Sequence, residues 1–135
     1  MAVHASIESA PVPAAAATLM HAAKVTLREA AWETDPAQRF ATAHLAALRA
    51  AAAVLAARAR VDGRSRRRPS SAWSLLGAVA PELVEWAAFF AAGATKRAAA
   101  QAGLPDAATQ READDLVRDV ETFLSVVERS VGLAA

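Results

Sequence analysis

The sequence predicts an all-α protein, an antiparallel bundle of four main helices plus one short helix. Hydrophobic residues make up 55% of the 135-residue chain, and most of them are alanine, which has the highest helix propensity. Strand-forming residues are scarce, because there is no Tyr and the only isoleucine is Ile7. Several segments also repeat apolar residues at the spacing of amphipathic helices.

The first half of the chain predicts a tail and two long helices. Residues 1–13 have no apolar periodicity and are expected to form a flexible tail. The domain proper is expected over residues 14–132. A first helix is predicted for residues 14–33, with an apolar stripe that consists of Leu19, Ala23, Leu27, Ala30 and Ala31.

The second helix is predicted from Pro36 to about Arg60. Asp35 can cap it, Pro36 suits the first helical position, and Gln38 stands where a capping-box partner belongs. Its apolar positions follow the spacing of one buried face. They are Phe40, His44, Ala47, Leu48, Ala51 and Leu55.

The second half predicts a connector and three helices. A basic connector is expected at residues 61–70, after which Ser70 or Ser71 can cap a short helix over residues 72–79. A fourth helix is predicted from Pro81 to a cap at Gly103.

Thr109 and Glu112 form a capping-box pattern that opens the last helix, and Gly132 is expected to end it. This helix has the most regular apolar repeat in the chain, made of Ala113, Leu116, Val117, Val120, Leu124, Val127 and Val131. On its solvated face the i, i+4 spacing predicts the ion pairs Arg111–Asp115 and Asp114–Arg118.

Composition limits the class of protein further. The chain has no Cys, which excludes disulfides and thiolate metal sites. No signal peptide is apparent, and the uncharged runs 69–81 and 86–95 are shorter than the roughly 20 residues that span a bilayer. No Gly-rich phosphate loop, metalloprotease motif or nucleophile elbow is present. We therefore expect a soluble, cytoplasmic protein with no membrane segment, metal or cofactor.

Charge is distributed unevenly although the net charge is only +1. Seven of the 14 acidic residues lie within 106–128, and six of the 15 basic residues lie within 58–68. Such a basic cluster is either a solvated connector or a sequence-independent contact for nucleic-acid phosphates. The candidate nucleic-acid-binding residues are Arg58, Arg60, Arg64, Arg66, Arg67 and Arg68.

The uncharged stretch from Trp86 to Thr95 is too apolar for one chain to bury fully. We expect the aromatic group of Trp73, Trp86, Phe89 and Phe90 to belong to the core, and any exposed remainder, at Phe89, to form a dimer face. A two-fold homodimer is the commonest way to cover such a patch, and the sequence therefore predicts self-association.

Three segments of this chain resemble a known superfamily. They are RFATAHLAALRAAAAVLAARAR (39–60), SAWSLLGAVAPELVEWAAFFAAGATKRAAAQAG (71–103) and READDLVRDVETFLSVVE (111–128). Together they resemble the actinobacterial branch of the HEPN superfamily over residues 19–130. The resemblance implies a bundle of four to five helices that commonly dimerises. It also implies either a metal-independent ribonuclease or an inactive module that binds nucleotide, RNA or a protein partner.

The superfamily's catalytic signature is an Arg followed, after four to six residues, by a His. Arg39 and His44 match it, and the resemblance implies a proton-transferring His beside an Arg that holds the scissile phosphate. With 13 Arg and 3 His in the chain, about one such match is expected by chance. Residues five positions apart also lie about 140° apart around an ideal helix.

The residues alone leave three functions open. His44 shares a face with Phe40 and Leu48, as a core histidine would, and His21 with His44 makes a poor metal site. The leading hypothesis is a HEPN-like module without strong catalysis that acts by binding, to itself, with RNA, nucleotide or a protein partner as further candidates. The alternatives are a metal-independent endoribonuclease that uses Arg39 and His44, and a purely structural homodimer.

Overall fold

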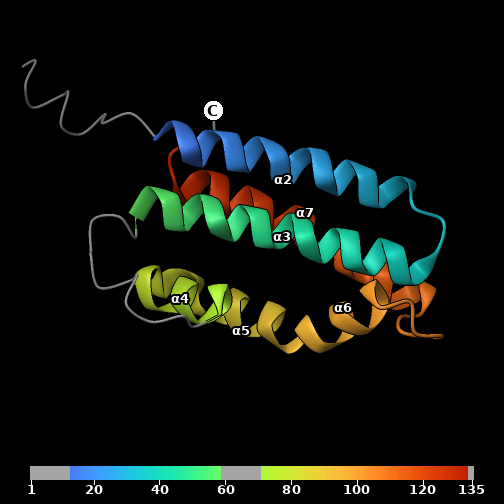
Figure 1. Ribbon diagram of the computed structural model, residues 1–135. Coiled ribbons are helices and arrows are strands. Elements are labelled where there is room, and N and C mark those ends of the chain that lie inside the picture. The colour runs from blue at the N-terminus through green and yellow to red at the C-terminus, as the bar shows by residue number, and fades with distance from the viewer. Residues whose placement is uncertain (1–12, 59–70, 134–135) are drawn as a thin grey trace, which may run out of the picture.

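The computed structural model describes residues 13–58 and 71–133, and those residues form helices joined by short connections. The predicted all-α bundle is confirmed (Figure 1). The expected tail and connector lie almost entirely outside the described residues. The elements are α2 (Ala14–Trp32), α3 (Pro36–Arg58), α4 (Ala72–Val79), the 3₁₀ helix η3 (Pro81–Leu83), α5 (Val84–Ala92), α6 (Ala94–Gln101) and α7 (Gln110–Ser130).

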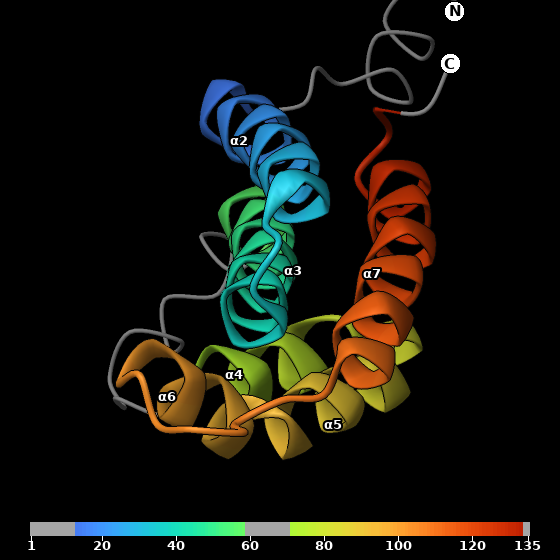
Figure 2. The ribbon, with the colours of Figure 1, turned by 90° about the vertical axis from the view of Figure 1, so that its right-hand side faces the viewer.

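Helix α3 is the centre of the bundle. It packs against α2, α7, α4 and α6, and the end-on view shows α2 above it, α7 beside it and the α4–α6 segment as a layer beneath (Figure 2). Helices α3 and α7 run in the same direction, because Arg39 contacts Asp114 at one end and Arg58 contacts Ser130 at the other. This is the relation between the second and fourth helices of an up-and-down bundle.

The predicted helix caps are confirmed at several positions. The Asp35 carboxylate accepts a 3.0 Å bond from the backbone N–H of Gln38, and the Ser71 hydroxyl accepts one of 3.1 Å from that of Ser74. Thr109 and Glu112 form the reciprocal capping box. At the C-terminal ends of α6 and α7, Gly103 (φ 77°) and Gly132 (φ 82°) adopt the left-handed conformation that favours glycine.

The prediction of one continuous helix from Pro81 to Gly103 is wrong. The segment starts as a 3₁₀ turn and then divides at Gly93 into α5 and α6. Glycine weakens a helix interior, and at this point the Phe90 carbonyl accepts a hydrogen bond from the His44 side chain. A Cβ at Gly93 would lie 3.5 Å from the Cδ2 atom of His44, so the break lies directly against the His44 ring.

The core combines small alanines with a cluster of aromatic rings. Trp73, Phe90 and Phe123 are buried, Trp86 packs against them, and ring centroids lie 4.8 Å apart for Phe90–Phe123 and 5.1 Å apart for Trp73–Phe90. The alanines that are completely buried on α2 and α3 are Ala16, Ala23, Ala30, Ala43, Ala46, Ala47, Ala50, Ala51 and Ala53.

The buried stripes differ in part from those predicted. On α2 the buried positions are Ala16, Met20, Ala23, Thr26 and Ala30, whereas Leu19 and Leu27 are half-buried and Ala31 is exposed. On α3, Leu48 and Leu55 are half-buried, and Val54 is fully buried instead. The reason on α3 is that neighbours cover it from several sides, so burial extends well beyond one stripe.

The ion pairs predicted on the last helix are also wrong. Asp114 pairs with Arg39 of α3, and Arg118 pairs with Asp115 at i, i+3 spacing. An ion pair within one helix stabilises it by only a few tenths of a kcal/mol. A carboxylate of α7 can therefore pair with an arginine of a neighbouring helix instead, as Asp114 does with Arg39.

Helix α3 is, by length and composition, long and apolar enough to cross a membrane, although it is interrupted by charged residues. Within the structure, 56% of that apolar window is buried. Such burial is typical of the central helix of a soluble protein, whose apolar side chains are covered by neighbouring helices.

Candidate functional site

The Arg39 guanidinium is held by several neighbours at the start of α3. It pairs with the Asp114 carboxylate of α7, and its Nε atom donates a 3.1 Å bond to the carbonyl of Glu33. A second terminal nitrogen donates to the carbonyl of Ala31 at 3.4 Å. The side chain is 22% exposed. Arg39 thus ties the beginning of α3 to the end of α2 and to the first turns of α7.

The His44 side chain lies in the core and is only 1% exposed. Its ring is near the rings of Phe40, Trp73 and Phe90, with centroid separations of 6.4, 5.7 and 5.9 Å. Its Nε2 atom lies 2.9 Å from the Phe90 carbonyl oxygen. Because a carbonyl can only accept, Nε2 carries the proton and donates.

The environment of His44 favours the neutral form of its ring. Burial lowers its pKa below the ordinary value, the bond to the Phe90 carbonyl acts in the opposite direction, and the nearby charge of Arg97 lowers the pKa further. With Nε2 protonated, Nδ1 is an acceptor, and it is buried without a partner among the described residues.

The structure does not bring the polar groups of Arg39 and His44 to one place. Arg39 bonds Asp114 and the carbonyls at the end of α2, whereas His44 bonds α5. The 140° expected between them on an ideal helix agrees with these separate partners. A shared phosphate would therefore have to displace the existing bonds of at least one of them.

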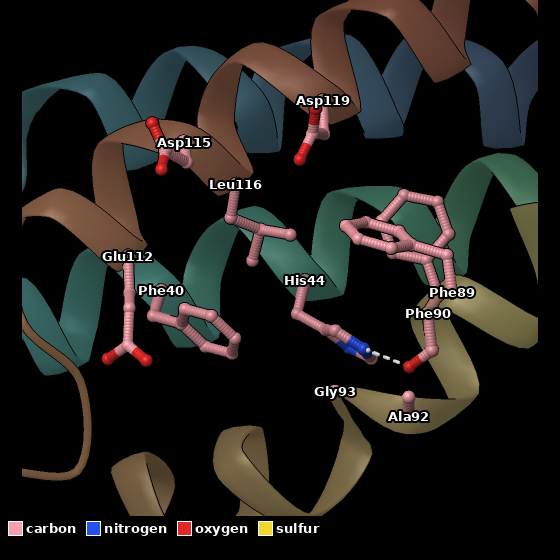
Figure 3. A pocket seen from close by; sticks show the side chains of 10 residues that line it. All are labelled: Phe40, His44, Phe89, Phe90, Ala92, Gly93, Glu112, Asp115, Leu116 and Asp119. Carbon is pink, nitrogen blue, oxygen red and sulfur yellow. Dashed lines mark hydrogen bonds between the residues drawn. The ribbon is translucent and has the colours of Figure 1, made fainter.

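His44 lies against a cavity of about 400 Å³ between α3, α5 and α7. Figure 3 shows apolar side chains at its base and carboxylates along its α7 side. The apolar lining includes Phe40, Phe89, Phe90 and Leu116, and the carboxylates are Glu112, Asp115 and Asp119.

A second cavity of about 400 Å³ continues the first one along α5 and η3. It is lined by Glu82, Glu85, Trp86, Phe89 and Asp119. Phe89 and Asp119 belong to both cavities, so we refer to the two together as the α5–α7 groove. Phe89 is 46% exposed, so it is the member of the aromatic group that remains outside the core.

The groove carries more negative than positive charge. Glu82 pairs with Arg58, Glu112 with Lys96, and Asp115 with Arg118. No cation within residues 13–58 and 71–133 pairs with Glu85 or Asp119. The surface beside His44 is thus apolar at its base and acidic along its edge.

Of the predicted basic cluster, the structure describes Arg58 only. Its guanidinium lies 2.6 Å from the Glu82 carboxylate and donates a 2.7 Å bond to the Ser130 hydroxyl. The hydrogen bond from Arg58 is the main reason that the pKa of Glu82 falls to about 2. The remaining candidates, Arg60, Arg64, Arg66, Arg67 and Arg68, lie outside the described residues.

His21 is exposed on α2, whereas His44 is buried on α3. In the described parts of the chain, no three His, Asp or Glu side chains are grouped closely enough to hold a metal ion. The structure therefore offers no arrangement that would unite the two histidines in a metal centre there.

The acidic edge of the groove was missed by the sequence reasoning. The sequence pattern assigns Glu112 to a capping box and Asp115 to a solvated ion pair and gives Asp119 no role, although the spacing of the three over two helical turns places them near one face. That spacing was an available indication, but the opposing aromatic face on α5 depends on how the helices pack.

The fold and this site define a small helical-bundle domain with a buried histidine on its second long helix, of the HEPN class. The family model described as SAV_6107-like HEPN matches residues 30–128, and the chain belongs to this family. No curated protein and no solved structure matches the chain.

Proposed function

We propose that this HEPN domain acts by binding and has no strong ribonuclease activity of its own. The observation that carries the proposal is the position of His44, which is buried and uses Nε2 to bond the Phe90 carbonyl. A general acid or base must reach the proton that it transfers. Neither ring nitrogen of His44 is available in this arrangement, since Nδ1 is buried too.

The charge of the neighbouring surface supports the same proposal. Glu112, Asp115 and Asp119 line the cavity beside His44. Carboxylates repel the phosphates that a ribonuclease must hold, whereas nucleic-acid sites use cations. Arg39, the cation of the signature, is neutralised by Asp114.

We expect the purified protein to leave single-stranded RNA intact in the presence of a metal chelator. Cleavage is followed on a labelled RNA, with Arg39→Ala and His44→Ala measured in parallel to detect a contaminating nuclease. Robust cleavage by the parent that both substitutions abolish would overturn the proposal and favour the metal-independent endoribonuclease.

RNA contact through the basic connector is a separate part of this proposal. Replacing Arg64, Arg66, Arg67 and Arg68 by Ser should weaken RNA binding and reduce its salt dependence, because fewer counterions are released. The melting temperature should hardly change. Titrations of labelled RNA at several salt concentrations measure both quantities, and a parent that binds no RNA at low salt would remove this function.

Self-association is the third part, and the outer face of α5 supports it. Val84, Ala88 and Ala91 are exposed at helical spacing and lie beside a shallow cavity of about 260 Å³ between α4 and α5. This uncharged face is distinct from the acidic edge of the groove. A two-fold contact would cover the same patch on both copies.

We expect light scattering at tens of micromolar to give twice the mass of the chain. Ala88→Glu should yield monomers, because a two-fold axis places two buried charges close together. Ala88→Ser is the matched control and should remain dimeric. A parent that is monomeric under these conditions would contradict self-association.

A further inference from the structure

The α5–α7 groove combines an exposed aromatic ring with an acidic edge. Its centre is formed by Phe89 and Asp119, the two residues that line both cavities. An exposed aromatic ring therefore lies beside a carboxylate that no described cation neutralises. Apolar surface continues on both sides of this centre, through Leu116 and Phe40 in one direction and Trp86 in the other.

We propose that the groove binds an arginine-bearing, otherwise apolar peptide segment of a partner protein. This inference rests on the proposed binding function and names its partner class. A guanidinium can pair with a carboxylate through two parallel hydrogen bonds and can stack on an aromatic face at the same time. Asp119 and Phe89 supply those two groups at the centre of the groove.

Charge complementarity determines the class of ligand. Five carboxylates line the groove, namely Glu82, Glu85, Glu112, Asp115 and Asp119, and three of them have cationic partners among the described residues. The groove consequently favours a cation and disfavours the phosphates of RNA. Its aromatic and aliphatic base favours apolar neighbours on either side of that cation over a fully hydrophilic segment.

The dimensions fit a short helix or strand. Helix α5 with η3 spans Pro81–Ala92, and at 1.5 Å per residue this side of the groove is roughly 15–18 Å long. About three turns of a partner helix cover that length. An amphipathic helix that places its apolar face in a groove is a common mode of peptide recognition.

The test uses the full-length protein and a fluorescent 14-residue peptide of Leu, Ala and Arg, with Arg at successive turns of one helix face. A second peptide replaces each Arg by citrulline, which keeps the shape and removes the charge. Fluorescence anisotropy should show binding of the arginine peptide at least tenfold tighter than that of the citrulline peptide, as expected for charged hydrogen bonds.

Variants of the protein locate the binding site. Asp119→Asn should remove most of the preference for arginine, and Phe89→Ser should weaken binding of the arginine peptide about fivefold. Glu121→Gln is the matched control, because Glu121 is an acid of the same helix that lines a different cavity. It should bind like the parent, and melting curves verify that all three variants are folded.

Several results would overturn the inference. They are equal binding of both peptides, an unchanged preference in Asp119→Asn, or binding that appears only after the connector arginines are replaced. The last result would mean that the chain's own connector occupies the groove. RNA cleavage by the parent would instead refute the proposed function, so the two failures are distinguishable.

Discussion

Replacing Phe123 by Ala is expected to lower the free energy of unfolding by about 3–5 kcal/mol, the range typical of deleting a buried aromatic ring. Phe123 is completely buried. Its ring centroid lies 4.8 Å from that of Phe90, 5.3 Å from Trp86 and 6.4 Å from Trp73. The substitution therefore leaves a cavity where helices α4, α5 and α7 meet.

Chemical denaturation monitored by circular dichroism measures this loss. Phe89→Ala is the matched control, since it deletes the same ring from a position that is 46% exposed. We expect it to cost about 1 kcal/mol, largely from its contacts with Phe90 and Trp86. Equal losses for the two variants would contradict the assignment of Phe123 to the centre of the core.

Replacing His44 by Ala is expected to cost about 1–3 kcal/mol of stability. The change removes a packed ring and leaves the Phe90 carbonyl without its side-chain donor. Thermal and denaturant melting measure the effect, and His21→Ala is the control because His21 is exposed. A His44→Ala protein that is as stable as the parent would show that the ring is not part of the core.

The same variant has a distinctive pH dependence. Burial lowers the pKa of His44 in the folded protein below its ordinary value of 6.5. The unfolded chain then binds the proton more readily, so the contribution of neutral His44 is complete above about pH 6.5 and is lost as the pH falls below it. The parent should therefore lose stability in this acidic range more steeply than His44→Ala does.

The sequence was most informative where local chemistry determines structure. Ser71 and Thr109 begin their helices as predicted, because a capping side chain needs only the N–H groups two or three residues ahead. The predicted apolar face of the last helix does not include Phe123, which is completely buried. It stands three residues after Val120 and four before Val127, so the periodicity was sufficient to identify it.

Long-range partners could not be predicted in the same way. Asp114 is correctly spaced for Arg118 on its own helix, yet it pairs with Arg39, which is 75 residues away in sequence. The choice depends on which faces of α3 and α7 meet. The break at Gly93 similarly depends on a contact with α3, since the adjacent carbonyl of Phe90 is bonded by His44.

In the candidate site, too, local features could be predicted from the sequence and features that depend on helix packing could not. The sequence leaves His44 open as a core residue or a catalytic group, and its burial and its bond to Phe90 agree with the first interpretation. The α5–α7 groove was not predicted, because its aromatic and acidic halves come from helices that are separated by the chain's longest irregular connection among the described residues, 102–109. Only packing places these halves opposite one another.

The central position of α3 has a consequence for the order of events during synthesis. This 23-residue helix has the length and hydropathy of a membrane-spanning segment, and one of its main covers, α7, begins only at Gln110. At about 5–20 residues per second, the ribosome needs roughly 3–10 s to travel from Arg58 to that point. The helix at the centre of the bundle is therefore made well before α7, and its burial can be completed only late in synthesis.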